Sequence, residues 1–148
     1  MTKSLLLLLP SLMLAGCSNA GNEALVFSDR SLEPCGEKPN CVSTIETRPD
    51  FNLSVFRLNR QGQNNWEAIQ HIALSLPGAS LGEQREHYIR VECRSKIFGF
   101  VDDFEVRLNG EELIVRSESR TGYSDFGVNR ERADLFRTRL ADAKYLKN

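Results

Sequence analysis

The pair Asn109-Gly110, flanked by two runs of alternating apolar and polar residues, constrains the fold of this chain more than any other feature. Asn-Gly is the strongest short signal for a two-residue β-hairpin loop, because both residues accept the positive φ angles that such a loop needs. A loop at these positions sets Val106 opposite Leu113 and Phe104 opposite Val115 on one face. A slip of one residue would move every side chain to the other face, so the pattern predicts a well-defined antiparallel hairpin.

The same register places two neighbouring aspartates on opposite faces of the hairpin. Asp103 points outward, opposite Arg116, and we expect an exposed ion pair there. Asp102 points toward the core, opposite Ser117, where an unpaired carboxylate would cost several kcal/mol. Asp102 therefore needs hydrogen-bond donors or a proton. The segment that follows supplies candidate donors: Ser119, Arg120, Tyr123, Asn129 and Arg130.

The sequence leaves two interpretations of Asp102 open. Its partners form a polar network that holds the last helix against the sheet, or they line a pocket for a ligand or a reaction, because perturbed carboxylates gather at functional sites. In a reaction, Asp102 and Tyr123 are the candidates for a catalytic role. The candidate ligand-binding residues are Asp102, Arg116, Ser117, Ser119, Arg120, Tyr123, Asn129 and Arg130.

An anion site is a related hypothesis. Arg116, Arg120 and Arg130, with the N-terminus of the last helix, form a group that can attract an anion. The aspartates at positions 102, 103 and 125 are equally placed to neutralise these arginines, and ion pairing is the simpler interpretation.

Helical spacing predicts two helices. The first begins at Asn64, which has Glu67 three residues later as a capping-box partner, and ends at Pro77-Gly78. The second begins at Val128-Asn129, with Asn129 as its N-cap. Its inward stripe is Ala133, Phe136, Leu140 and Ala143, and its four arginines are expected on solvated faces: Arg130, Arg132, Arg137 and Arg139.

Alternation also predicts strands within residues 51–58 and 88–95. The elements together predict an α+β fold, with an antiparallel sheet of three to four strands and two helices packed on one face. The chain divides into residues 1–16, a cleaved leader; residues 17–34, a tether; and residues 35–148, a single globular domain.

The leader has a charged residue, Lys3, followed by an apolar run over residues 5–14 that is about half as long as a membrane-spanning helix. Leu14-Ala15-Gly16-Cys17 resembles the lipobox of bacterial lipoproteins. That resemblance implies cleavage before Cys17, lipidation of its sulfur and amino group, and attachment to the membrane. Ser18, in place of an aspartate, implies the outer membrane, facing the periplasm, rather than the inner membrane. The alternative is an ordinary signal peptide with an incidental cysteine.

The other cysteines fit an oxidising compartment. Cys35 and Cys41 lie six positions apart in a segment rich in Pro and Gly, and we expect a disulfide between them. Cys93 alternates with apolar residues of a strand and is expected to be a buried free thiol. His71 and His87 show no ligand spacing with the cysteines, so no metal site is predicted.

Composition and motifs exclude several functions. The formal net charge of −1 argues against nucleic-acid binding, which favours strongly basic domains. The sequence contains no nucleophile elbow, phosphate-binding P-loop, His-Glu-x-x-His motif or dinucleotide fingerprint. No cofactor is therefore predicted, and binding is favoured over catalysis.

Four segments resemble the family called "domain of unknown function 1499", and the resemblance extends from about Leu32 to Leu140. The segments are residues 34–35, 39–43, 98–103 and 116–132. Glu118 stands where many members carry a small residue. The resemblance implies a small envelope or membrane-associated domain, and it implies no activity, cofactor or catalytic residue.

Three functions are consistent with these features. The favoured one is a lipid-anchored periplasmic binding or accessory module, with a small anionic ligand or an envelope protein as its partner. The second is an enzyme that uses Asp102 as acid or base, and the third is a structural lipoprotein of an envelope assembly. A deep pocket lined by Asp102, Arg120 and Tyr123 would favour the first two, and an exposed apolar patch would favour the third.

Overall fold

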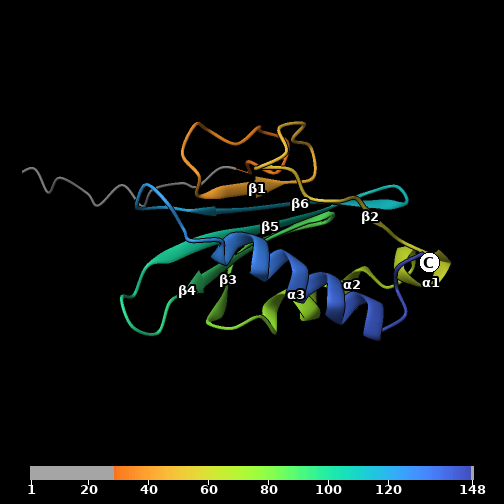
Figure 1. Cartoon of the computed structure of the whole chain (residues 1–148). Coiled ribbons are helices and arrows are strands. Elements are labelled where there is room, and N and C mark those ends of the chain that lie inside the picture. Colours follow the sequence, from red (N-terminus) through yellow and green to blue (C-terminus); the bar gives the residue numbers. More distant parts are fainter. Residues whose placement is uncertain (1–28, 148) are drawn as a thin grey trace, which may run out of the picture.

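The computed structural model describes residues 29–147, which fold around one antiparallel sheet (Figure 1). Four strands follow one another as a meander, in the order β6-β5-β4-β3 across the sheet, and two short strands pair with the outer edge of β6. The strands are β1 (Cys41–Ser43), β2 (Phe56–Arg57), β3 (Ala79–Arg85), β4 (Tyr88–Arg94), β5 (Val101–Asn109) and β6 (Glu112–Ser119). The helices are α1 (Arg60–Gln63), α2 (Trp66–Leu74) and α3 (Val128–Asp142).

The α+β class agrees with the prediction, but the described sheet has six strands rather than three to four. Strands β1 and β2 contain only three and two residues, which is too short to produce an alternating pattern. Strand β3 lies at the edge of the sheet, and most of its side chains are exposed. Without a buried face it has no apolar alternation, so the sequence does not reveal it.

The helices also differ from the prediction, since three are present in the described chain instead of two. Helix α1 has four residues and lies against the C-terminal segment rather than extending the helical layer on the sheet. A Cβ atom on Gly62 would lie only 2.4 Å from the carbonyl oxygen of Tyr145, so this close approach requires glycine.

The β5–β6 hairpin forms where predicted, but its loop is Gly110-Glu111 and its register is shifted by two residues. Asn109 stays in the strand, paired with Glu112, and Gly110 takes the first loop position with a φ of 60°. Glycine with positive φ at this position is typical of a type II′ turn, whereas the predicted type I′ turn needs positive φ at Asn109 as well. A shift of two preserves the faces, so Val106 now opposes Val115.

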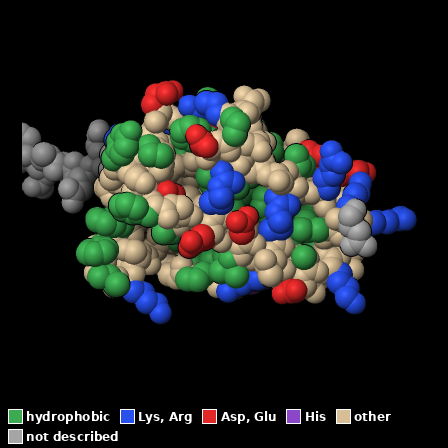
Figure 2. Space-filling view, in the orientation of Figure 1, with side chains coloured by type: hydrophobic (Ala, Val, Ile, Leu, Met, Phe, Trp, Pro, Cys, Tyr) green, Lys and Arg blue, Asp and Glu red, His purple; other side chains and the backbone are tan. Residues whose placement is uncertain are grey.

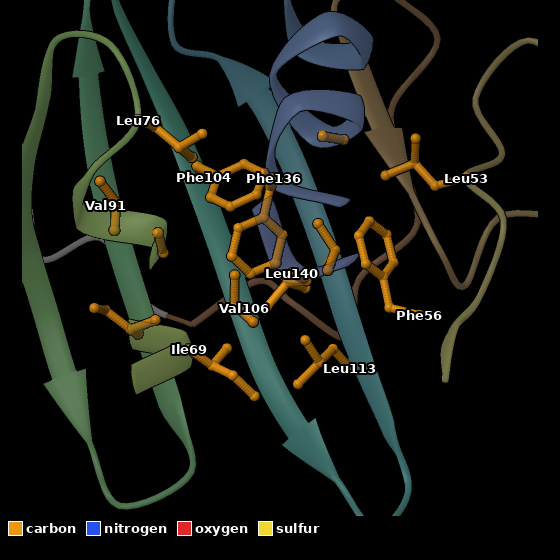
Figure 3. Packing of buried hydrophobic residues seen from close by; sticks show 14 of the residues in the cluster. Leu53, Phe56, Ile69, Leu76, Val91, Phe104, Val106, Leu113, Phe136 and Leu140 are labelled. Carbon is orange, nitrogen blue, oxygen red and sulfur yellow. The ribbon is translucent and has the colours of Figure 1, made fainter. Parts of the chain in front are cut away.

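The core lies between one face of the sheet and helices α2 and α3 (Figure 3). Phe104 of β5 meets Phe136 of α3 edge to face, with ring centroids 5.2 Å apart. Ile69 of α2 and Leu140 of α3 are fully buried in the same cluster. The predicted inward stripe of the last helix is therefore correct at positions 133, 136 and 140.

The opposite face of the sheet, which we call the outer face, is covered in part by the loops of residues 29–50 (Figure 1). The backbone N–H of Arg30 donates to the Glu105 carboxylate at 2.8 Å, and Asp29 pairs with Arg107. Ser31 is fully buried. Residues 29–34, predicted to be part of the tether, therefore include segments packed on the sheet.

The cysteines match the prediction where the structure describes them. Cys35 and Cys41 form a disulfide, and Cys93 is a buried free thiol. Burial raises the pKa of the Cys93 thiol to about 11, so its reactive thiolate is scarce at neutral pH. The predicted lipidation site, Cys17, lies outside the described residues.

Candidate functional site

Asp102 and Asp103 point to opposite faces of β5, as predicted, and each has an arginine partner that the sequence did not assign to it: Arg132 for Asp102 and Arg90 for Asp103. Asp102 is buried on the helix side, and its Oδ2 accepts a hydrogen bond of 2.7 Å from Nη2 of Arg132. The same guanidinium donates through Nη1 to Asn129 Oδ1 at 2.7 Å and to Ser117 Oγ at 3.1 Å. Arg132 thus links helix α3 to β5 and β6.

Asn129 is the second centre of this inner network, rather than the N-cap of α3. The N-cap is Gly127, with a φ of 87°, and the Asp125 carboxylate accepts from the N–H groups of Gly127 and Asn129 at 2.9 and 3.0 Å. The Asn129 side chain is therefore free to turn inward, where it accepts from Ser117 Oγ at 2.6 Å and donates to Ser119 Oγ at 3.0 Å.

Several predicted members of the Asp102 group lie elsewhere. Tyr123 is 71% exposed, and Arg120 lies on the outer face with Asp103. Arg130 donates to the carbonyl oxygens of Asn52 and Asp50. Asp102, Arg120 and Tyr123 therefore do not line one pocket. Of the two interpretations of Asp102, the contacts match the polar network that holds the last helix against the sheet.

The α3 arginines, predicted on solvated faces, are half-buried, and each donates hydrogen bonds to other parts of the domain. Beyond Arg130 and Arg132, Arg137 donates to the carbonyl oxygens of Ser54 and Val55, and Arg139 donates to Ser75 Oγ. These partners lie 64 or more positions away in the chain, and no local pattern identifies them. The arginines attach α3 to its surroundings on both sides of its apolar stripe.

The outer face of the sheet carries charged side chains at alternate positions of three adjacent strands. Because successive side chains of a strand point to opposite faces, these residues share one surface. Asp103 is central, and its Oδ1 lies 3.0 Å from Arg90 Nη1 and 2.7 Å from Arg120 Nη2. Arg120 also contacts Glu92 at 2.6 Å. The hydrogen bonds to Asp103 and Glu92 raise the pKa of the Arg120 guanidinium, and the bond to Asp103 contributes most.

Arg116 and Glu105 form a fully buried pair beside this cluster, in contrast to the predicted exposed pair between Arg116 and Asp103. Arg116 Nη1 lies 3.6 Å from Glu105 Oε2 and 2.9 Å from Glu118 Oε2. Within residues 29–147, its Nε and Nη2 atoms have no hydrogen-bond partner. Glu105 accepts a hydrogen bond of 2.7 Å from the Tyr88 hydroxyl, yet burial raises the pKa of its carboxyl.

A pocket of about 450 Å³ opens above these charges. Its floor is the charged outer face, and one wall is the disulfide loop over residues 36–40. Lys38 on this wall is exposed, and among the described residues its amine makes no hydrogen bond or ion pair. The charged floor residues are Arg30, Arg90, Asp103, Glu105, Glu118 and Arg120.

Two further observations concern metal ligands and membrane spans among the described residues. Within residues 29–147, no three His, Cys, Asp or Glu side chains form a group that could hold a metal ion. None of the helices in that range has the length and apolar character needed to cross a membrane.

Residues 31–140 match the sequence model of a protein family described as "Protein of unknown function (DUF1499)". The match covers most of the chain and almost exactly the predicted span. The chain belongs to the DUF1499 family. No curated protein and no solved structure matches the chain.

Sequence reasoning missed most of the pocket of this DUF1499 domain. Of the residues that line it, Ser119 and Arg120 were predicted ligand-binding candidates. The signal for the floor was present, since Arg90 and Glu92 alternate with the apolar residues of β4, and Asp103 and Glu105 lie on the opposite face of β5 from Phe104 and Val106. The wall had no such signal, because the loop that carries Lys38 is far in the chain from the strands that form the floor.

Proposed function

We propose that this DUF1499 protein is a lipid-anchored protein of the bacterial envelope, and that its domain binds a small anionic ligand in the outer-face pocket. The leader and Cys17 support the anchor, and Ser18 favours the outer membrane, facing the periplasm. The Cys35–Cys41 disulfide is consistent with that oxidising compartment.

The observation that carries the binding proposal is the pocket, with the amine of Lys38 on its rim. Pockets of this volume are typical of small-molecule sites. Arg30, Arg90 and Arg120 line the same hollow and already hold carboxylates, so a ligand carboxylate or phosphate would join an existing network. Lys38 would supply a cation that no described residue neutralises.

Glu105 gives the proposed binding a pH dependence. Burial already raises the pKa of Glu105, and a bound anion nearby would raise it further, because like charges disfavour each other. Anion binding and proton uptake by Glu105 therefore favour one another. Affinity is expected to increase as the pH falls.

A titration with inorganic phosphate and simple organic phosphates, followed by amide NMR shifts, tests the pocket. We expect shifts at Lys38, Asn40 and Arg120, and about fivefold weaker binding in Lys38→Ala, since one exposed charge is worth about 1 kcal/mol. Lys147→Ala removes the same charge at a position outside the pocket and should bind like wild type. Shifts spread over the surface, or equal losses in both variants, would exclude the pocket as the site.

The anchor has its own test. Mass spectrometry of the mature N-terminal peptide should find Cys17 at the N-terminus with lipid attached. Cleavage elsewhere, or an unmodified Cys17, would remove this half of the proposal and leave the pocket untouched.

A structural role in an envelope assembly is the second candidate. Apolar side chains that are mostly exposed, among them Ile97 and Phe126, favour it. An enzyme based on Asp102 has less support, because Arg132 already holds that carboxylate in a buried network.

A further inference from the structure

Apolar side chains gather at one end of the sheet, in the loop between β4 and β5 and in the loop before α3. Ile97 and Phe98 are 85% and 74% exposed, Phe100 is 55% exposed, and Phe126 of the second loop is 92% exposed. The two loops leave the sheet together, since the N–H of Arg120 donates to the Val101 carbonyl oxygen. Figure 2 shows hydrophobic side chains collected at the end where the β4–β5 loop lies in Figure 1. We call these four residues the apolar tip.

The β4–β5 loop holds its aromatic rings in a defined arrangement. The rings of Phe98 and Phe100 stack with centroids 5.6 Å apart, on either side of Gly99, whose φ is 68°. The backbone N–H of Phe100 donates a hydrogen bond to the Ser95 hydroxyl. The backbone N–H of Ser95 donates in turn to the Phe100 carbonyl oxygen. Arg94 donates to the Gly99 carbonyl at 2.9 Å. The loop is thus braced to present two rings that add little to the core.

Phe126 is held outward at a conformational cost. Its φ is 53°, in the left-handed region where a bulky side chain is disfavoured. The Asp125 carboxylate fixes this turn by accepting the N–H of Gly127. A phenylalanine that is 92% exposed adds little to the packing of the domain, so its ring is available for a contact outside it.

We propose that the apolar tip inserts into the headgroup region of a phospholipid membrane, with Arg94 and Lys96 contacting anionic lipid phosphates. The segment 94–100 has two basic residues and no acidic one, which complements an anionic surface. Aromatic and aliphatic side chains beside basic ones are typical of membrane-surface binding.

The length of the tether supports a membrane rather than a protein partner as the occupant. Eleven residues separate Cys17 from Asp29, and even fully extended they span at most about 40 Å. If Cys17 carries lipid, as the proposed function states, the domain stays within that distance of the bilayer. The tip then supplies a contact with the bilayer besides the lipid on Cys17.

The test uses the chain from residue 17 to its end with Cys17→Ser, which contains the described fold and carries no lipid. Vesicles of phosphatidylethanolamine and phosphatidylglycerol should co-sediment this chain, and vesicles of phosphatidylcholine should retain less. The double variant Phe98→Ser, Phe126→Ser should reduce binding about tenfold or more, because it removes two large apolar side chains. Leu81→Ser, which changes an exposed apolar residue on strand β3, is the matched control and should bind like the parent.

Fluorescence locates the contact. The chain has a single tryptophan, Trp66 of α2, so Phe98→Trp adds one reporter at the tip. Brominated lipids should quench the added reporter and leave the signal of the parent chain unchanged.

Equal binding by the parent and the tip double variant, or no binding by either, would overturn the inference. So would a concentration-dependent dimer that the tip substitutions abolish without any vesicle binding, since a second copy would then cover the tip. Failure of the anchor is separate, because an unmodified Cys17 would leave vesicle binding by the tip intact. Failure of the pocket is also separate, since Lys38→Ala should not change vesicle binding.

Discussion

Asp102 and Asp103 are neighbours in the sequence, yet the two faces of the sheet give them different surroundings. On the inner face, Asp102 meets one arginine from a packed helix, and this arginine also satisfies Ser117 and Asn129. On the outer face, Asp103 shares two arginines with Glu92 beneath a pocket of about 450 Å³.

The difference arises from what covers each face. Helix α3 packs along the inner face, where its side chains fill the space and close the polar network. Over the outer face lie loops and the disulfide segment, which leave a hollow above the charged strands. An aspartate therefore has a structural role at position 102, where a helix covers it, and is a candidate for ligand recognition at position 103, where loops leave a pocket above it.

The largest expected effect tests the inner network. Arg132→Met leaves the Asp102 carboxylate buried without its cation, and we expect a loss of about 3–5 kcal/mol in the free energy of unfolding. Urea unfolding measures it. Arg139→Met, on the same helix, removes an exposed hydrogen bond to Ser75 Oγ; it is the control and should cost under about 1 kcal/mol. Equal losses would show that the network does not fasten α3.

A smaller effect is expected at the buried pair of the outer face. Arg116→Met should cost about 1–3 kcal/mol, because Glu105 keeps the Tyr88 hydroxyl and the Arg30 N–H as donors. Adding Glu105→Gln should recover most of this loss, since the unpaired charge is removed. A double-mutant cycle by urea unfolding checks the coupling, and strictly additive losses would show that the two side chains do not act as a pair.

The smallest effect concerns the outer cover and depends on pH. Hydrogen bonds from Arg48 lower the pKa of Glu46 from 4.5 to about 2, and Glu46 also accepts the N–H of Cys35 in the disulfide loop. A lowered carboxyl pKa adds stability above the unfolded value, and that stability is lost as the pH falls from 4.5 toward 2.

Unfolding measured across this range should therefore show a shallower pH dependence in Glu46→Gln than in wild type. Glu33→Gln changes an exposed carboxylate that pairs with Arg30; it is the control and should follow wild type. A slope unchanged in Glu46→Gln would mean that this carboxylate does not stabilise the disulfide loop.

The hairpin illustrates how far the sequence predicts this fold. Alternation identified both strands and their faces, because burial on one side is a local, periodic signal. The register was wrong by two residues, since the choice between two turn types depends on a small energetic difference at Asn109. Strand β3 was missed because an exposed edge strand has no such signal.

The candidate site was predicted only in part, for a different reason. Burial of Asp102 followed from its face, but its partner Arg132 did not, because a long side chain beside an apolar stripe can reach either water or the sheet. The pocket depends on a loop near Lys38 closing over strands more than 50 positions away. Contacts of that kind leave no pattern in the sequence.

Urea unfolding of Asp102→Ala and Asp103→Ala at neutral pH, each with and without inorganic phosphate, tests the contrast between the two faces most directly. Asp102→Ala should lose about 3–5 kcal/mol, while phosphate stabilises it as much as wild type. Asp103→Ala should lose less, because Glu92 still holds Arg90 and Arg120, and phosphate should stabilise it more than wild type, since a competing anion is gone. Equal losses, or a phosphate effect that changes only in Asp102→Ala, would contradict the assignment of structure to the inner face and binding to the outer one.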